Sequence, residues 1–168
     1  ISNSIFFNKF KNKNFYCPKQ HFKKKVFYEL IKNYFISFDT VIIKLKYLKK
    51  LSHMIDERFN IIHDMDLLIR LSNISEMNYA PFLLSKWRMR EESLSYNNFS
   101  TIIKEKKIFI NKLSRLKKND SKFKKSKIDY LDILYRQEIL LLLSQKKFFK
   151  VFSLLKKLKL NMKNSILV

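Results

Sequence analysis

The side chains that could do chemistry gather in one stretch of the chain, residues 56–95. Carboxylates, guanidinium groups and the only tryptophan lie close together there: Asp56, Glu57, Asp64, Asp66, Trp87, Arg88 and Arg90. Asp64 and Asp66 stand two residues apart at a predicted helix start, where a carboxylate can act as a general base, bind a metal ion or cap the helix. On residue types alone, these three roles stay open.

The composition excludes several kinds of site. The 168 residues contain no glycine, so neither a dinucleotide-binding fingerprint nor a P-loop can be present, because both need glycine where the backbone meets phosphate. Cys17 is the only cysteine, which excludes an internal disulfide. The histidines His21, His53 and His63 lack zinc-site spacing, so we predict no metal ligands in this chain.

The chain is strongly basic, with 36 Lys and Arg against 14 Asp and Glu and a net charge of +22. Such a charge attracts polyanions, including nucleic acid, anionic lipid and phosphorylated substrates. A genome rich in A and T offers another explanation, since Lys, Asn, Ile, Phe and Tyr are frequent while alanine occurs once. The charge alone therefore does not decide the function.

Hydrophobic spacing predicts the elements that must position the central side chains. Within the first hundred residues, a short strand is expected at 5–7. Five further elements are expected: a helix at 26–33, a buried strand at 34–44, a short helix at 47–54, a helix at 64–72 and a buried strand at 80–84. The helix at 64–72 has the clearest pattern, because Met65, Leu68 and Ile69 share one face. Its first turn holds Asp64 and Asp66, where carboxylates complement the helix dipole.

The last third of the chain is predicted to be helical and basic. Helices are expected at 101–117, 128–143 and 146–160, with a basic turn at 117–127. Residues 101–168 contain 19 Lys and Arg against 5 Asp and Glu, which leaves +14 of the total charge. Lysine alternates with Leu, Phe and Ile at helical spacing. This pattern suits either a helix lying on an anionic membrane or the solvated face of a helical subdomain.

Seven short motifs resemble, in order and spacing, the second half of the family-2 inverting glycosyltransferases. They are residues 33–37, 40–44, 56–59 (DERF), 63–67 (HDMDL), 70–71 (RL), 79–81 (YAP) and 87–95 (WRMREESLS). Each motif is weak alone, and their collinear order over residues 5–100 makes the resemblance specific.

The resemblance implies roles for individual residues. Asp64 matches the catalytic base, which removes the proton from the acceptor hydroxyl as that hydroxyl attacks the sugar's anomeric carbon. Asp66, Trp87, Arg88 and Arg90 are expected to bind the substrate or the leaving diphosphate, whose negative charge needs compensation. Asp66 stands one position off the family's motif, so it is also expected to orient the helix start or a neighbouring loop. His63 stands where the family has glutamate, and Arg90 stands where it has histidine.

The family's upstream half, with its nucleotide-binding strands and Asp-x-Asp motif, has no counterpart in these residues. We therefore expect an α/β fold: residues 1–100 form a partial GT-A sheet with flanking helices, the acceptor-side part of a transferase domain. A basic all-helical region, 101–168, follows. A divalent metal, Mg or Mn, is expected in the intact enzyme with ligands outside this chain, and the fragment is expected to be inactive alone.

The expected reaction transfers a sugar, with inversion, from a nucleotide-sugar donor to a hydroxyl of a glycan or lipid-linked acceptor. The expected location is the cytoplasm, with peripheral contact to an anionic membrane at the inner face and no specific nucleic acid partner. An alternative from a different class is a non-catalytic basic helical module that binds nucleic acid or an anionic membrane surface.

Overall fold

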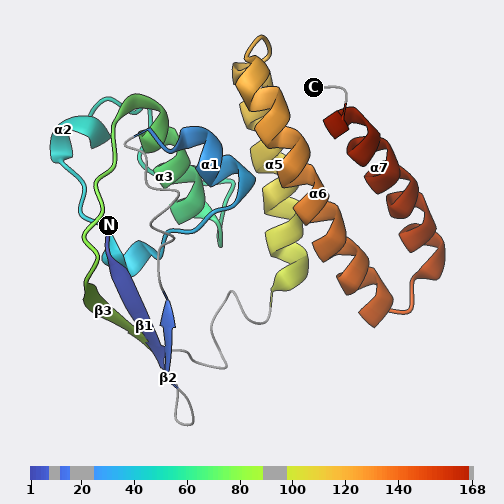
Figure 1. Ribbon diagram of the computed structural model, residues 1–168, viewed down its shortest axis with the longest axis horizontal. Coiled ribbons are helices and arrows are strands. Elements are labelled where there is room, and N and C mark those ends of the chain that lie inside the picture. Colours follow the sequence, from blue (N-terminus) through green and yellow to red (C-terminus); the bar gives the residue numbers. More distant parts are fainter. Residues whose placement is uncertain (8–11, 16–24, 89–97, 167–168) are drawn as a thin grey trace. The chain divides into compact units, whose positions relative to one another are not determined.

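The structure is a computed structural model that describes residues 1–7, 12–15, 25–88 and 98–166 (Figure 1). The chain divides into two compact units, Ile1–Asn97 (unit 1) and Asn98–Val168 (unit 2). Unit 1 contains strands and helices and unit 2 only helices, so the described chain is mixed but mostly helical. None of its described helices combines the length and hydropathy needed to cross a bilayer.

The sheet of unit 1 has three strands in the order β2-β1-β3 (Figure 1). They are β1 (Asn3–Phe7), β2 (Asn12–Phe15) and β3 (Leu83–Arg88). β1 runs antiparallel to β2 and parallel to β3, with Ser4 paired to Ser85. Because β1 and β3 are far apart in sequence, their pairing brings the two ends of unit 1 together.

The helices of unit 1 build its core. α1 (Phe27–Lys32) packs against α3 (His63–Ile74), and a short helix, α2 (Leu45–Leu48), also contacts α3. The buried apolar side chains come mainly from these elements: Phe27, Leu30, Ile31, Phe59, Ile62, Met65, Leu68 and Ile69. The predicted helices at 26–33 and 64–72 are confirmed, while the helix predicted at 47–54 is shorter and begins earlier.

One of the two predicted buried strands of unit 1 is wrong, and the other is displaced along the sequence and exposed at its start. Residues 34–44 form no strand; a 3-10 turn, η2 (Phe38–Thr40), interrupts them, and Ile42 is 95% exposed. The Ser37 carbonyl accepts hydrogen bonds from both the amide and the hydroxyl of Thr40, and such local bonds compete with strand pairing. The second strand begins at Leu83, after Pro81, rather than at residue 80, and Leu83 and Leu84 are exposed.

Asp39 joins the η2 turn to the sheet. The buried Ser4 hydroxyl of β1 donates to its carboxylate at 2.7 Å, and the Ser37 hydroxyl donates to the other oxygen. Partial burial opposes ionisation, but the hydrogen bonds from Ser37 and Ser4 outweigh it and lower the pKa of Asp39. The ionised carboxylate therefore stabilises the folded unit.

Unit 1 should accordingly lose stability in acid through Asp39. Because the folded-state pKa lies below the unfolded value of about 4, the contribution is present above that pH and disappears as pH falls through the folded pKa. We expect Asp39→Asn to be less stable than wild type at neutral pH, with the difference closing in acid. Trp87, the only tryptophan, lies in β3, so its fluorescence reports unfolding of unit 1. A difference that stays constant with pH would contradict this role.

Unit 2 consists of α5 (Phe99–Leu116), α6 (Ser121–Ser144) and α7 (Phe148–Ile166), joined by short turns (Figure 1). Apolar residues of all three helices are buried: Ile103, Phe109, Ile110, Leu113, Phe123, Leu134, Val151 and Leu154. The predicted basic turn at 117–127 is wrong over most of its length. α6 begins at Ser121 because the Asp120 carboxylate accepts the Phe123 amide at 2.9 Å and caps the helix.

The turn between α6 and α7 takes its shape without glycine. The Lys147 amide donates to the Leu142 carbonyl at 2.9 Å and the Lys146 amide to the Leu143 carbonyl at 3.0 Å, the paired bonds of a Schellman motif. That motif needs a left-handed residue after the helix, and Lys146 occupies the position with φ of 57°. Helix α7 therefore starts directly after a defined turn.

Candidate functional site

The first turn of α3 places Asp64 and Asp66 in different surroundings. α3 forms because Met65, Leu68 and Ile69 lie on one face and are buried against the helices of unit 1. Asp66 is 0% exposed, on the buried side, whereas Asp64 is only partly buried. Two carboxylates two residues apart therefore have separate roles.

Asp66 forms an enclosed ion pair with Arg70, one helical turn further along. Arg70 Nε lies 2.7 Å from Asp66 Oδ2, and the Arg70 side chain is only 11% exposed. The other guanidinium nitrogens donate to the carbonyls of His53 and Met54 at 2.7 and 3.0 Å. The pair thus fastens the loop before α3 to the helix. This enclosed pair suits the orienting role expected for Asp66, and its role in binding substrate stays a prediction.

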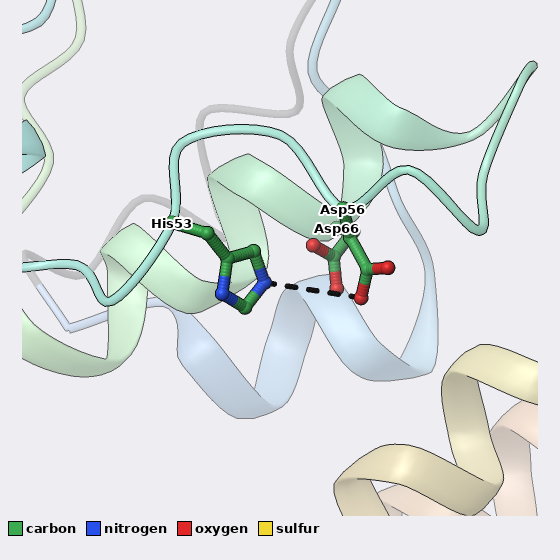
Figure 2. A group of neighbouring side chains, drawn as sticks. All are labelled: His53, Asp56 and Asp66. Atoms are coloured by element: carbon green, nitrogen blue, oxygen red, sulfur yellow. Dashed lines mark ion pairs between the residues drawn. The ribbon is translucent and has the colours of Figure 1, made fainter.

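Asp56 completes the same cluster (Figure 2). Both oxygens of this buried carboxylate accept from the Arg58 guanidinium, at 2.8 and 2.6 Å, and one also accepts the Arg58 amide at 3.2 Å. His53 Nε2 lies 3.8 Å from Asp56 Oδ2. The DERF motif therefore encodes a bidentate arginine–carboxylate pair two residues apart.

His53, Asp56 and Asp66 offer atoms within 4.8 Å of one another, which is close enough to consider a metal ion. The donor set does not fit one. The carboxylates are already paired with Arg58 and Arg70, and two guanidinium groups beside a dication would repel it. The cluster is a charge-balanced ion-pair network, and the expected metal ligands outside this chain stay a prediction.

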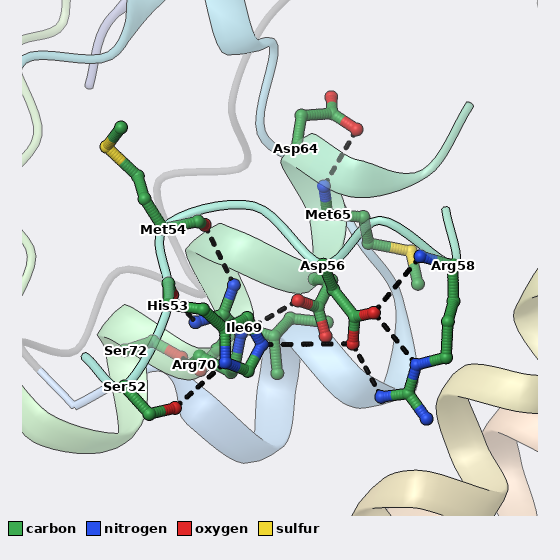
Figure 3. A network of polar contacts seen from close by, with 11 residues as sticks. Ser52, His53, Met54, Asp56, Arg58, Asp64, Met65, Ile69, Arg70 and Ser72 are labelled. Atoms are coloured by element: carbon green, nitrogen blue, oxygen red, sulfur yellow. Dashed lines mark hydrogen bonds and ion pairs between the residues drawn. The ribbon is translucent and has the colours of Figure 1, made fainter. Parts of the chain in front are cut away.

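Asp64 points away from this network (Figure 3). Its Oδ1 accepts the amide of the next residue, Met65, at 2.7 Å. Within the described residues, no arginine or lysine pairs with it. Burial raises the pKa of Asp64, although the Met65 amide and nearby His63 oppose that change. A partly buried carboxylate with a raised pKa has the properties required of a general base.

Tyr34 lies close to Asp64 and was not singled out in the sequence. Burial, and secondarily the negative charge of Asp64, raise the pKa of Tyr34, so the phenol stays protonated. Its buried hydroxyl has no hydrogen-bond partner among the described residues, which is unusual for a buried polar group. Tyr34 is therefore the strongest additional candidate for the site around Asp64. Its position next to Asn33, at the end of α1, gave no sequence signal for this role.

Of the residues predicted to bind diphosphate or acceptor, the structure describes Trp87 and Arg88, which lie on a different element from Asp64. Trp87 and exposed Arg88 lie at the end of β3, which packs against β1 and η2, whereas α3 packs against α1 and α2. Arg90 lies outside the described residues. Their roles in binding diphosphate remain predictions.

A half-open cavity of about 450 Å³ lies at the opposite end of α3 from Asp64. Aromatic and polar side chains line it: Phe27, Tyr28, Tyr47, Ser72, Asn73 and Glu76. We place the candidate site at Asp64 rather than in this cavity, because only Asp64 combines partial burial, a raised pKa and freedom from a basic partner among the described residues.

Comparison with known proteins finds no matching family model, no similar curated protein and no similar solved structure.

Proposed function

We propose that unit 1 is the acceptor-side part of an inverting sugar transferase, with Asp64 as its general base. The partial burial and the raised pKa of Asp64 are the observation that carries this proposal. Asp64 is the aspartate of the central stretch that is partly buried with a raised pKa, whereas Asp56 and Asp66 are held by arginines. The ordered motifs over residues 5–100 supply the reaction class.

In the proposed reaction, an acceptor hydroxyl hydrogen-bonds to the Asp64 carboxylate. Its oxygen attacks the anomeric carbon of a nucleotide sugar as its proton passes to Asp64, and the bond to the nucleoside diphosphate breaks on the opposite face. The raised pKa makes Asp64 a stronger base than an ordinary aspartate. Arg88 and Arg90 are the proposed partners of the leaving diphosphate, and Trp87 is the proposed platform for the acceptor.

Unit 1 also carries surface that suits a further part of a domain. Its exposed apolar side chains lie in the η2–α2 region, the loop before α3 and the start of β3: Ile42, Leu45, Met54, Ile55, Phe82 and Leu84. β2 and β3 are the edges of the described sheet, and sheet edges can accept additional strands. We propose that polypeptide outside these residues covers this surface, extends the sheet to the GT-A type and binds the donor.

The 168 residues alone should therefore bind nucleotide sugars poorly. Calorimetric titration of UDP- and GDP-sugars with Mn²⁺ into the chain should show no tight binding. The donor-side half of the domain, with its own Asp-x-Asp motif, is proposed to lie on other polypeptide, and the 168 residues contain no glycine for a phosphate loop. Micromolar binding by these residues alone would contradict the proposed division of the domain.

The function itself is tested on the polypeptide expressed from the complete reading frame. Release of nucleoside diphosphate from a panel of nucleotide sugars, supplied with glycan and lipid-linked acceptors, should be abolished by Asp64→Asn. Asp132→Asn serves as the matched control, because Asp132 forms an exposed ion pair with Arg136 in unit 2. Transfer by the Asp64→Asn variant at the wild-type rate would remove Asp64 from the role of base.

A further inference from the structure

Helix α7 has a second apolar face. Buried Val151 and Leu154 lie three residues apart on the face that packs against α6. Phe148, Phe152 and Leu155, spaced by four and three residues, form another face, and all three are exposed. Phe149 beside them is 95% exposed. A helix that needed only to complete the bundle of unit 2 would carry polar residues there.

Exposed apolar residues also lie at the end of α6, directly before the turn. Leu140 and Leu143 are exposed immediately before the Schellman turn, and Phe148 and Phe149 follow it. The paired hydrogen bonds of the turn fix where α6 ends and α7 begins. We call the exposed apolar residues of this region the hairpin tip: Leu140, Leu143, Phe148, Phe149, Phe152 and Leu155.

The charged side chains from residue 139 onward, which include those of the hairpin tip, are all positive. Glu138 is the last acidic residue of the chain, and residues 139–168 contain seven lysines and no Asp or Glu. The lysines in and around the tip are exposed: Lys146, Lys147, Lys150, Lys156 and Lys157. An occupant of this surface must therefore present negative charge beside an apolar layer.

We propose that the hairpin tip docks on the surface of an anionic membrane, with its phenylalanines and leucines in the acyl layer and its lysines at the lipid phosphates. A lipid bilayer with anionic headgroups offers both properties at one surface. Nucleic acid supplies the charge but no hydrocarbon layer for the leucines, and a second copy of this chain has the same positive charge. The proposal rests on unit 2 alone and is independent of the sugar-transfer proposal.

Co-sedimentation of the 168-residue chain with vesicles tests the docking. We expect binding to vesicles of equal parts phosphatidylcholine and phosphatidylglycerol, little binding to phosphatidylcholine alone, and weakening as salt rises. The double variant Phe149→Ser/Phe152→Ser should bind at least about tenfold more weakly, because two large apolar side chains no longer enter the bilayer. Both residues are exposed, so circular dichroism should show an unchanged fold.

A matched control removes an exposed apolar side chain elsewhere in unit 2. Leu116→Ser, at the end of α5, should leave vesicle binding unchanged. Lys150→Gln/Lys157→Gln should weaken binding and reduce its dependence on salt.

Tryptophan fluorescence of the Phe149→Trp variant measures insertion of the hairpin tip into the bilayer directly. In a Trp87→Phe background, Phe149→Trp should give blue-shifted emission and quenching by brominated lipid when anionic vesicles are added, while Leu116→Trp should not. Three results would overturn the proposal: no sedimentation with anionic vesicles at low salt, equal binding by the Phe149→Ser/Phe152→Ser variant, or self-association that this variant abolishes without vesicles.

Discussion

Asp66→Asn should lower the unfolding free energy of unit 1 by about 3 to 5 kcal/mol, the loss typical when one partner of a buried ion pair is removed. Asparagine keeps the size of the side chain and can still accept one hydrogen bond from Arg70. It removes the charge that compensates a guanidinium only 11% exposed. The loop at His53 and Met54 depends on the same guanidinium, so its attachment to α3 should weaken as well.

The comparison pair for this prediction lies in unit 2. Asp132 and Arg136 have the same spacing of four residues and nearly the same separation, 2.8 Å, but the Arg136 side chain is 57% exposed. Asp132→Asn should therefore remove only about 0.3 to 0.5 kcal/mol. Urea unfolding followed by Trp87 fluorescence reports unit 1, and circular dichroism reports the helices of both units. A loss below about 1 kcal/mol for Asp66→Asn would show that the pair behaves as a solvent-exposed one.

Helices with a clear apolar face were predictable from the sequence. The spacing of Met65, Leu68 and Ile69 predicts α3, and their burial in the structure follows from that spacing. The long helices of unit 2 follow in the same way from repeated apolar residues. The two units divide between Asn97 and Asn98, whereas the sequence predicted the boundary three residues later, after residue 100.

Elements that depend on local hydrogen bonds were not predictable from hydrophobicity. Residues 34–44 are rich in β-branched and aromatic types, as a strand would be, but Ser37 and Asp39 form a turn there instead. Asp120 likewise starts α6 inside a lysine-rich segment that hydrophobic spacing assigns to a turn. In both places short polar side chains decide the backbone path.

The candidate site was predictable in part. The resemblance assigned the role of base to Asp64 and not to Asp66, and the structure shows how their surroundings differ. Arg70 pairs with Asp66, while no basic residue of the described chain pairs with Asp64. The spacing of four residues between Asp66 and Arg70 is the signal that could have identified the ion pair. No comparable signal marks Tyr34, because its burial near Asp64 arises from packing between distant segments.

Asp64→Asn should separate stability from activity. If Asp64 is the proposed base, its loss should reduce turnover by about 10²- to 10⁴-fold in the polypeptide expressed from the complete reading frame. The same substitution should leave unit 1 as stable as wild type, or more stable, at neutral pH. Burial raises the pKa of Asp64, so ionising it opposes folding, and asparagine removes that penalty while its oxygen still accepts the Met65 amide.

The stability difference between Asp64→Asn and wild type should depend on pH, and its direction follows from the raised pKa of Asp64. Below the unfolded pKa of about 4, Asp64 is neutral in both states and the variant should match wild type. As pH rises through the folded pKa, wild type should lose stability relative to the variant. Asp39→Asn is the internal comparison, because its carboxylate has a lowered pKa and its loss should destabilise unit 1 over the same range. If Asp64→Asn instead destabilises unit 1 at neutral pH, the Asp64 carboxylate serves the fold, and its proposed role as a base loses its physical support.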